Sequence, residues 1–160
     1  MNPSLLKTEA TTNPLPKRPY HASCHCRRIR LTIHLPPLES LTINTCNCSI
    51  CTKNGYLVAY PLEGDVVVES CGEGEGNEEM GMGNGMGEYR FGERRKPHWF
   101  CRECGTSMMV GFGESGFVEE RGLVAVNIRT FDGIEDVLDK LTYRKVDGKH
   151  NLNPPYKTGS

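Results

Sequence analysis

The sequence lacks a long apolar run, and no stretch of its 160 residues approaches the ~20 apolar residues that a membrane-spanning helix needs. Residues 1–19 also lack the apolar segment of a secretory signal peptide, although they contain Lys7, Lys17 and Arg18. A strong excess of charge is missing too, since the formal net charge is −1. We therefore expect a cytoplasmic protein, with neither a membrane nor a nucleic acid among its partners.

Long helical patterns are also missing. Eighteen glycines and ten prolines favour turns and short strands. Polar and apolar residues alternate clearly from Arg28 to Leu35, which is typical of a half-buried strand. Similar short segments predict strands over 41–45, 56–60, 66–69, 88–92, 97–100, 108–112, 123–129 and 142–146. Apolar residues follow helical spacing only over 134–141. We predict a mainly β fold of short antiparallel strands in small packed sheets, with one short helix near the C-terminus.

The length fits one domain, which we place at residues 20–150. Residues 1–19 have no hydrophobic period and are predicted to be a flexible N-terminal tail, with organelle targeting as the alternative. Residues 151–160 form a predicted C-terminal tail. Residues 72–87 read GEGEGNEEMGMGNGMG, and such a segment buries too little side chain to offset its backbone entropy. We expect a flexible insertion there, the alternative being a lid over a site.

Cysteine is the residue type whose distribution is most informative. Seven of the eight cysteines lie in three clusters, namely Cys24/Cys26, Cys46/Cys48/Cys51 and Cys101/Cys104. Disulfides are the competing interpretation, but two thiols separated by one residue make strained partners, and we expect no oxidising compartment. Metal binding is therefore favoured. Cys71 lies outside the clusters and is expected to be a small buried hydrophobe.

The counts of two, three and two suggest two metal sites. A structural zinc takes four protein ligands, whereas a catalytic zinc takes three and keeps one position open. Four plus three accounts for all seven clustered cysteines. The modest apolar fraction of 37% agrees with a small core that metal ions supplement.

The order of several motifs resembles one known family. The motifs are Ser23-Cys24-His25-Cys26, Cys46-Asn47-Cys48-Ser49-Ile50-Cys51, Tyr89-Arg90-Phe91-Gly92, the run from His98 to Ser107 (HWFCRECGTS) and Val126-Asn127-Ile128-Arg129. Together they resemble the glutathione-dependent formaldehyde-activating enzyme and centromere protein V family over about residues 20–147. The resemblance implies an all-β zinc fold. It also implies that Cys24, Cys26, Cys101 and Cys104 hold a structural zinc and that Cys46, Cys48 and Cys51 hold a second, reactive zinc.

The activity that the resemblance implies is condensation of formaldehyde with glutathione, which is a carbon–sulfur lyase reaction in reverse. Three thiolates leave one position on the metal that suits a substrate thiol, and coordination lowers the pKa of that thiol. We therefore expect a lyase acting on a small-molecule thiol or its carbonyl adduct, with Cys46, Cys48 and Cys51 as ligands of its reactive zinc. A non-catalytic zinc-binding module for protein contacts is the alternative.

Some side chains have two interpretations at this stage. His25, His98 or Cys71 could supply a fourth ligand and close the second site. Basic residues could bind the carboxylates of an anionic thiol or simply form a solvated face; they are Arg27, Arg28, Lys53, Arg94, Arg95 and Lys96. Asn127 and Arg129 alternate with apolar residues, so they could line a pocket or lie on an exposed strand face.

Overall fold

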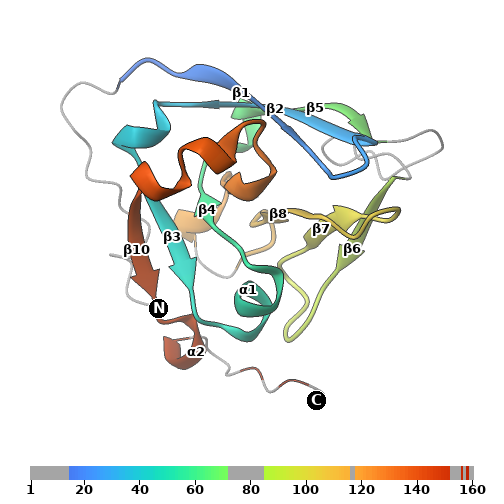
Figure 1. Cartoon of the computed structure of the whole chain (residues 1–160). Helices are drawn as coiled ribbons and strands as arrows, with labels where there is room; N and C mark the ends of the chain where they lie inside the picture. Colours follow the sequence, from blue (N-terminus) through green and yellow to red (C-terminus); the bar gives the residue numbers. More distant parts are fainter. Residues whose placement is uncertain (1–14, 72–84, 116–117, 152–155, 157, 159–160) are drawn as a thin grey trace.

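The computed structural model describes residues 15–71, 85–115, 118–151, 156 and 158. Within this part of the chain, ten strands form two sheets (Figure 1). The three-stranded sheet has the order β1 (Arg18–Ser23), β2 (Ile29–Leu35), β5 (Val66–Cys71). The seven-stranded sheet has the order β10 (Thr142–Val146), β3 (Thr42–Cys46), β4 (Val58–Ala59), β9 (Val124–Asn127), β8 (Ser107–Gly111), β7 (His98–Cys101), β6 (Met86–Tyr89). The mainly β prediction is confirmed.

Helices are short. The α-helices are α1 (Ser49–Asn54) and α2 (Gly148–Asn151). The 3₁₀ turns are η2 (Leu38–Ser40), η3 (Glu63–Asp65), η5 (Val118–Glu120), η6 (Ile128–Thr130), η7 (Ile134–Asp136) and η8 (Leu138–Lys140). None of the helices in the described part of the chain is long and apolar enough to cross a membrane. The predicted short helix near the C-terminus is present as α2, but residues 134–141 form two 3₁₀ turns. Val137, at φ −127° and ψ −7°, interrupts helical geometry between them.

Within the described part of the chain, strand pairing is antiparallel with one exception. β10 runs parallel to β3, with Val146 opposite Cys46. A parallel partner carries the chain in the same direction past the end of β3. The residues after β10 are thereby brought beside the triple-cysteine segment that follows β3.

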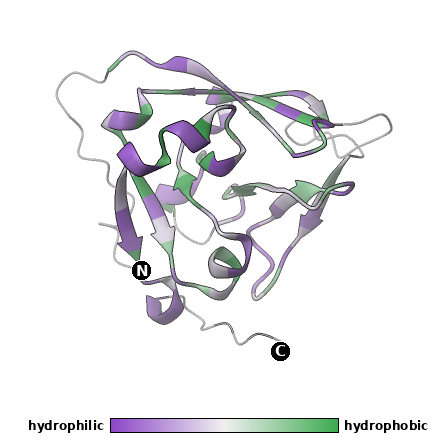
Figure 2. Ribbon diagram, in the orientation of Figure 1, coloured by the Kyte–Doolittle hydropathy of each residue, from purple (hydrophilic) through white to green (hydrophobic). Residues whose placement is uncertain are grey.

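The alternation in β2 buries Ile29, Leu31 and Ile33 in the main core. A second, smaller hydrophobic cluster consists of Tyr56, Val58, Val110, Phe112 and Ala125. Hydrophobic residues lie along the strands of the core, whereas the edge strand β10 and the helix α2 are largely hydrophilic (Figure 2). Ile50 and Cys51 of α1 pack against the second cluster, so the triple-cysteine segment is seated on this smaller core.

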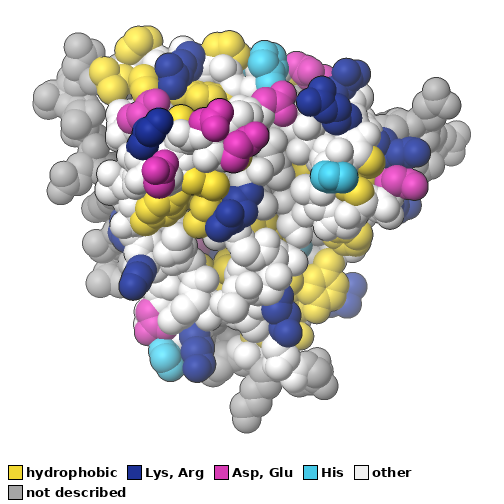
Figure 3. Space-filling view, in the orientation of Figure 1, with side chains coloured by type: hydrophobic (Ala, Val, Ile, Leu, Met, Phe, Trp, Pro, Cys, Tyr) yellow, Lys and Arg dark blue, Asp and Glu magenta, His cyan; other side chains and the backbone are white. Residues whose placement is uncertain are grey.

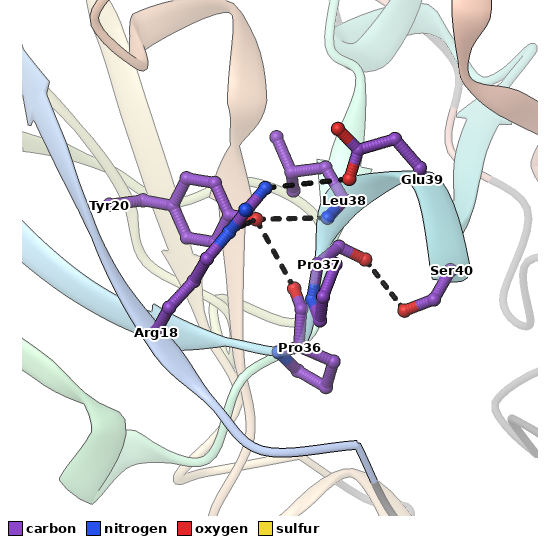
Figure 4. A network of polar contacts seen from close by, with 7 residues as sticks. All are labelled: Arg18, Tyr20, Pro36, Pro37, Leu38, Glu39 and Ser40. Carbon is purple, nitrogen blue, oxygen red and sulfur yellow. Dashed lines mark hydrogen bonds and ion pairs between the residues drawn. The ribbon is translucent and has the colours of Figure 1, made fainter.

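The folded domain begins earlier than predicted, because Arg18 and Pro19 belong to β1 rather than to a tail. Figure 4 shows the polar network that fixes this strand. The Tyr20 hydroxyl accepts from Arg18 Nε at 2.6 Å and from the Leu38 N–H at 2.9 Å. Arg18 also lies 3.4 Å from Glu39 Oε2. These contacts tie β1 to η2, and they depend on residues too distant in sequence for local patterns to show.

The predicted flexible insertion at 72–87 falls largely on residues 72–84, which lie outside the described residues. The last part of this prediction is wrong. Met86 and Gly87 begin β6, and Met86 is buried opposite Cys101. A Cβ on Gly87 would lie 2.6 Å from the Phe100 ring, so glycine is needed there for close strand packing. The glycine-rich composition hid this strand start.

Candidate metal centres

Two tight turns bring Cys24, Cys26, Cys101 and Cys104 together. Cys24 and Cys26 follow β1, whereas Cys101 ends β7 and Cys104 lies in the turn before β8. Their four sulfurs all lie within 4.8 Å of one another. Cys26 Sγ is 3.5 Å from Cys24 Sγ and 3.7 Å from Cys101 Sγ. This four-cysteine group has the ligand number and donor type of a structural zinc site.

Each turn bends through a residue with positive φ. Gly105 has φ 73° and its N–H donates to the Cys101 carbonyl, and Arg27 has φ 60° and donates to the Cys24 carbonyl. The Ile29 N–H donates to Cys24 Sγ at 3.2 Å. Backbone donors of this kind stabilise thiolate ligands. The sequence therefore builds two matching turns that face one another with sulfurs inside.

Protonation of the four-cysteine group is uneven. Burial raises the pKa of the Cys24 thiol to about 12. Burial also disfavours ionisation of Cys104, but hydrogen bonds from the side chain and backbone of Thr106 outweigh it and lower the pKa of that thiol to about 5. The group therefore ionises in part only, and a divalent cation would have to displace the remaining protons.

The second group consists of Cys46, Cys48 and Cys51. Cys46 ends β3, Cys48 is the N-cap of α1, and Cys51 lies in the first turn of that helix. The N-cap and the third helical residue share one side of a helix, so both sulfurs face Cys46. All three sulfurs lie within 4.8 Å of one another, and the Cys48 N–H donates to Cys46 Sγ at 3.4 Å.

One thiolate between two thiols is the charge state that this triple-cysteine site favours. Hydrogen bonds from the Cys48 and Cys51 thiols lower the pKa of Cys46 to about 2. The same contacts with Cys46 raise the pKa of Cys48 and of Cys51. Three thiols converging at this distance fit a soft divalent cation, which replaces the protons that they otherwise share.

No other histidine, cysteine or carboxylate among the described residues joins the three sulfurs. Each residue considered as a fourth ligand lies elsewhere. His25 is exposed on the turn of the four-cysteine group, where its backbone N–H donates to Thr106 Oγ1. His98 is buried in β7, with Nδ1 3.4 Å from the Tyr56 hydroxyl. Cys71 is buried in the main core, as predicted for a solitary cysteine.

Two tyrosines border the triple-cysteine site. The Tyr56 N–H donates to the Cys51 carbonyl at 3.1 Å. Burial raises the pKa of the Tyr56 hydroxyl, and it raises the pKa of Tyr60 to about 12. The electrostatic effect of Cys51 adds to both shifts, and that of Cys46 adds to the shift of Tyr60. Both hydroxyls therefore stay protonated at neutral pH, and they can only donate or accept hydrogen bonds beside the sulfurs.

Three of the six basic residues named above are paired with acidic ones. Lys96 lies 2.5 Å from the buried Glu120, Arg95 lies 3.3 Å from Glu93, and Arg28 lies 3.8 Å from Glu103. On the face shown in Figure 3, the described Lys and Arg side chains are scattered and form no continuous patch. For these three residues, ion pairing is thus the observed contact.

Asn127 and Arg129 do not share a strand face. β9 ends at Asn127, which is buried and caps η6 by accepting from the Arg129 N–H at 3.3 Å. Its amide also donates to the Ser107 carbonyl at 2.9 Å. Arg129 donates through Nε to the Gly55 carbonyl at 2.7 Å. Both residues hold backbone around the end of α1, so the prediction that they alternate along one strand was wrong.

The residues that sequence reasoning missed lie after β10. Asn47 bonds to Asp147, and Gly148 lies against Cys46. The one local signal was the position of Asn47 between two cysteines. Its partners are about a hundred residues away, and only the parallel pairing of β10 with β3 brings them to it.

Comparison with known proteins adds the fold alone. No family model and no curated protein matches the chain. A crystal structure of a Rhodobacter sphaeroides protein, solved as a structural-genomics target, is similar to it with a TM-score of 0.58 and 22% sequence identity. That similarity covers 78% of this chain and 99% of the other. The architecture thus recurs in a protein whose description assigns it no activity.

Proposed function

We propose that the protein is a zinc-dependent carbon–sulfur lyase acting on a thiol–carbonyl adduct. The observation that supports this most is the convergence of three thiols, from Cys46, Cys48 and Cys51, without a fourth histidine, cysteine or carboxylate in the described part of the chain. Three protein ligands and one free position are typical of catalytic zinc. The resemblance in motif order to the glutathione-dependent formaldehyde-activating family supports the reaction class.

In this proposal the protein holds two zinc ions per chain, one in the four-cysteine group and one in the triple-cysteine site. Zinc in the triple-cysteine site would accept a substrate thiol and lower its pKa, supplying a nucleophile at neutral pH. The partner is a small-molecule thiol or its adduct, such as glutathione with an aldehyde. We place the activity in the cytoplasm, where thiols stay reduced.

The chain's own residues have distinct parts in this proposal. The three cysteines fix the ligand geometry from β3 and α1. Tyr56 and Tyr60 stay protonated and exclude water from the buried side of the site. Burial lowers the pKa of His98 to about 4, so its neutral ring can accept a hydrogen bond from the Tyr56 hydroxyl at Nδ1 and orient that hydroxyl.

Cobalt tests the free position directly. Protein loaded with Co²⁺ at the triple-cysteine site should change its visible spectrum when a small thiol is added, because a further sulfur enters the coordination shell. The zinc-loaded protein should accelerate exchange of thiol–aldehyde adducts. Cys46→Ser, Cys48→Ser and Cys51→Ser should each abolish that activity, whereas Cys71→Ala, a change at a cysteine outside both groups, should preserve it.

A cobalt spectrum that is indifferent to every thiol tested would contradict the lyase proposal. Such a result, together with two firmly bound metals and no adduct exchange, would favour the non-catalytic zinc module instead. Metal analysis under reducing conditions is the accompanying check, and we expect a value near two per chain.

A further inference from the structure

The turn after β10 lies directly on the triple-cysteine site. Val146 is opposite Cys46 in the parallel pair, and the Asn47 N–H donates to the Val146 carbonyl at 3.1 Å. The chain then continues beside Asn47 and Cys48 into α2. We call residues 146–151 the C-terminal clamp, and the contacts below bind it to the loop that presents the cysteines.

The Asn47 side chain holds the clamp through both of its polar atoms. Nδ2 donates to Asp147 Oδ1 at 2.8 Å, and Oδ1 accepts from the Lys149 N–H at 2.8 Å. Asp147 is itself positioned by His150, whose Nδ1 lies 2.9 Å from each carboxylate oxygen. Asn47 lies between two of the three cysteines, so these bonds fix the backbone that carries the sulfurs.

Gly148 makes the closest approach. It is buried, and a Cβ built on it would lie 2.4 Å from Cys46 Sγ and 3.1 Å from the Cβ of Cys48. Real Cβ atoms do not approach a sulfur so closely, and the nearby Cys48 backbone gives little room to move. The Gly148 N–H also donates to Cys46 Sγ, as the Cys48 N–H does. Cys46 is therefore held by backbone donors from both the clamp and its own loop.

We propose that the C-terminal clamp is a positioning element for the metal in the triple-cysteine site, with Gly148 and the Asn47–Asp147 pair as its working residues. The inference rests on the metal part of the proposed function. N–H donors aimed at a ligating sulfur fix its orientation and offset its charge, and loss of such outer contacts typically lowers metal affinity ~10–100-fold. The clamp acts through Cys46 and does not itself touch the substrate.

Gly148→Ala tests the close approach. Zinc affinity at the triple-cysteine site, measured by chelator competition, should fall about 10–100-fold, and the four-cysteine group should keep its metal. Gly64→Ala is the matched control, because a Cβ at Gly64 has nothing within 4 Å, and it should leave both affinities unchanged. Unchanged affinity in Gly148→Ala would overturn the inference.

A charge exchange tests the Asn47–Asp147 bond without adding volume. Asn47→Asp puts two carboxylates at a contact of 2.8 Å and should weaken metal binding at the triple-cysteine site. Adding Asp147→Asn restores a donor and an acceptor across the same contact, and it should recover most of the lost affinity. His150→Ala removes a contact to Asp147 but leaves the Asn47 bonds in place, so it should lower the affinity less than Asn47→Asp does. Failure of the double variant to recover affinity, with both variants folded, would contradict the positioning role.

These measurements distinguish a failure of the clamp inference from a failure of the proposed lyase reaction. A wild-type protein that binds metal tightly but exchanges no adducts would contradict the proposed reaction, while loss of affinity in Gly148→Ala would still support the clamp. An active wild type whose Gly148→Ala variant binds metal normally would contradict the clamp alone. A wild type with no metal affinity at the triple-cysteine site would overturn both.

Discussion

At the residue scale, His98 has the clearest conflict between its chemistry and its surroundings. The side chain is buried in β7, between the Tyr56 hydroxyl and the Phe91 ring, whose centroid lies 5.4 Å away. Burial lowers its pKa to about 4, and the positive charge of Lys96 adds to the shift. The folded protein therefore holds a neutral imidazole at a pH where an exposed histidine begins to protonate.

This shift predicts a pH dependence of stability. The unfolded chain binds a proton near the ordinary histidine pKa of ~6.5, whereas the folded chain resists it until about pH 4. The contribution of His98 is thus complete above pH 6.5 and is lost as the pH falls toward 4. Urea unfolding at pH 7 and pH 5 should show a smaller loss in His98→Gln than in wild type, by on the order of 1–2 kcal/mol. Equal losses would indicate that the ring protonates freely.

The two turns of the four-cysteine group predict opposite effects of matched substitutions. Arg27 and Gly105 both have positive φ, 60° and 73°, which side chains with a Cβ adopt at a cost of ~1–2 kcal/mol. Arg27→Gly should raise the free energy of unfolding by up to about 1 kcal/mol, because glycine relieves that cost but has more freedom when unfolded. Gly105→Ala should lower the free energy of unfolding by about 1–2 kcal/mol.

A lack of space does not explain the expected effect of Gly105→Ala, since a Cβ on Gly105 has nothing within 4 Å. Thermal and urea unfolding of the metal-loaded variants would measure both changes. Destabilisation by Arg27→Gly of the same size as by Gly105→Ala would show that the Arg27 side chain contributes more than its backbone strain costs.

At the element scale, the packing of β7 against β8 depends on the absence of a side chain at Gly111. Gly111 of β8 leaves room for the Trp99 ring of β7, and a Cβ there would lie 2.4 Å from the Trp99 ring and 3.0 Å from Pro97. Gly111→Ala should lower the free energy of unfolding by about 1–3 kcal/mol through overpacking, and it should shift the tryptophan fluorescence. Gly113→Ala is the control, because its Cβ would meet nothing within 4 Å. A null effect at Gly111 would mean that the ring repacks without cost.

Strands are easiest to predict from sequence where one face is buried and the other is exposed to solvent. β2 follows its predicted bounds closely, because alternation over several residues records burial on one side. β10 also matches its predicted bounds, although none of its residues is buried. β1 was missed at its start because its anchor is the Tyr20 hydroxyl network with η2. Residues 134–141 have helical spacing but form 3₁₀ turns, since Val137 leaves helical geometry while the apolar side chains of the segment pack on the core.

The metal sites were most predictable where their ligands lie close together in the sequence. The sequence groups all three cysteines of the triple-cysteine site: helical spacing brings Cys48 and Cys51 together on α1, and Cys46 is only two residues earlier, at the end of β3. The grouping of Cys24 and Cys26 with Cys101 and Cys104 follows the family resemblance, and the sulfurs do converge. The clamp was not predictable, because its contacts require the parallel pairing of β10 with β3. Parallel partners far apart in sequence leave no periodic signal in either strand.

At the scale of the whole molecule, the four-cysteine group joins the two sheets. Cys24 and Cys26 belong to the turn between β1 and β2 of the three-stranded sheet, whereas Cys101 and Cys104 belong to the turn between β7 and β8 of the seven-stranded sheet. A metal held there would cross-link the two sheets and add to the polar contacts between the same turns, such as the His25 N–H bond to Thr106 Oγ1. The triple-cysteine site, in contrast, lies at the end of one sheet and on the smaller core.

This placement predicts that the two sites contribute to different properties. Cys104→Ala should lower the melting temperature severely or prevent folding, because a structural zinc contributes on the order of 10 kcal/mol or more of folding free energy. Cys48→Ala should leave a folded protein that has lost the second metal, since the contacts between the sheets do not involve it. Metal analysis and calorimetry on both variants would check this, with Cys71→Ala as the control for loss of a buried thiol. Similar melting losses in Cys104→Ala and Cys48→Ala would contradict the division, because they would mean that the triple-cysteine site supports the fold as strongly as the junction between the sheets does.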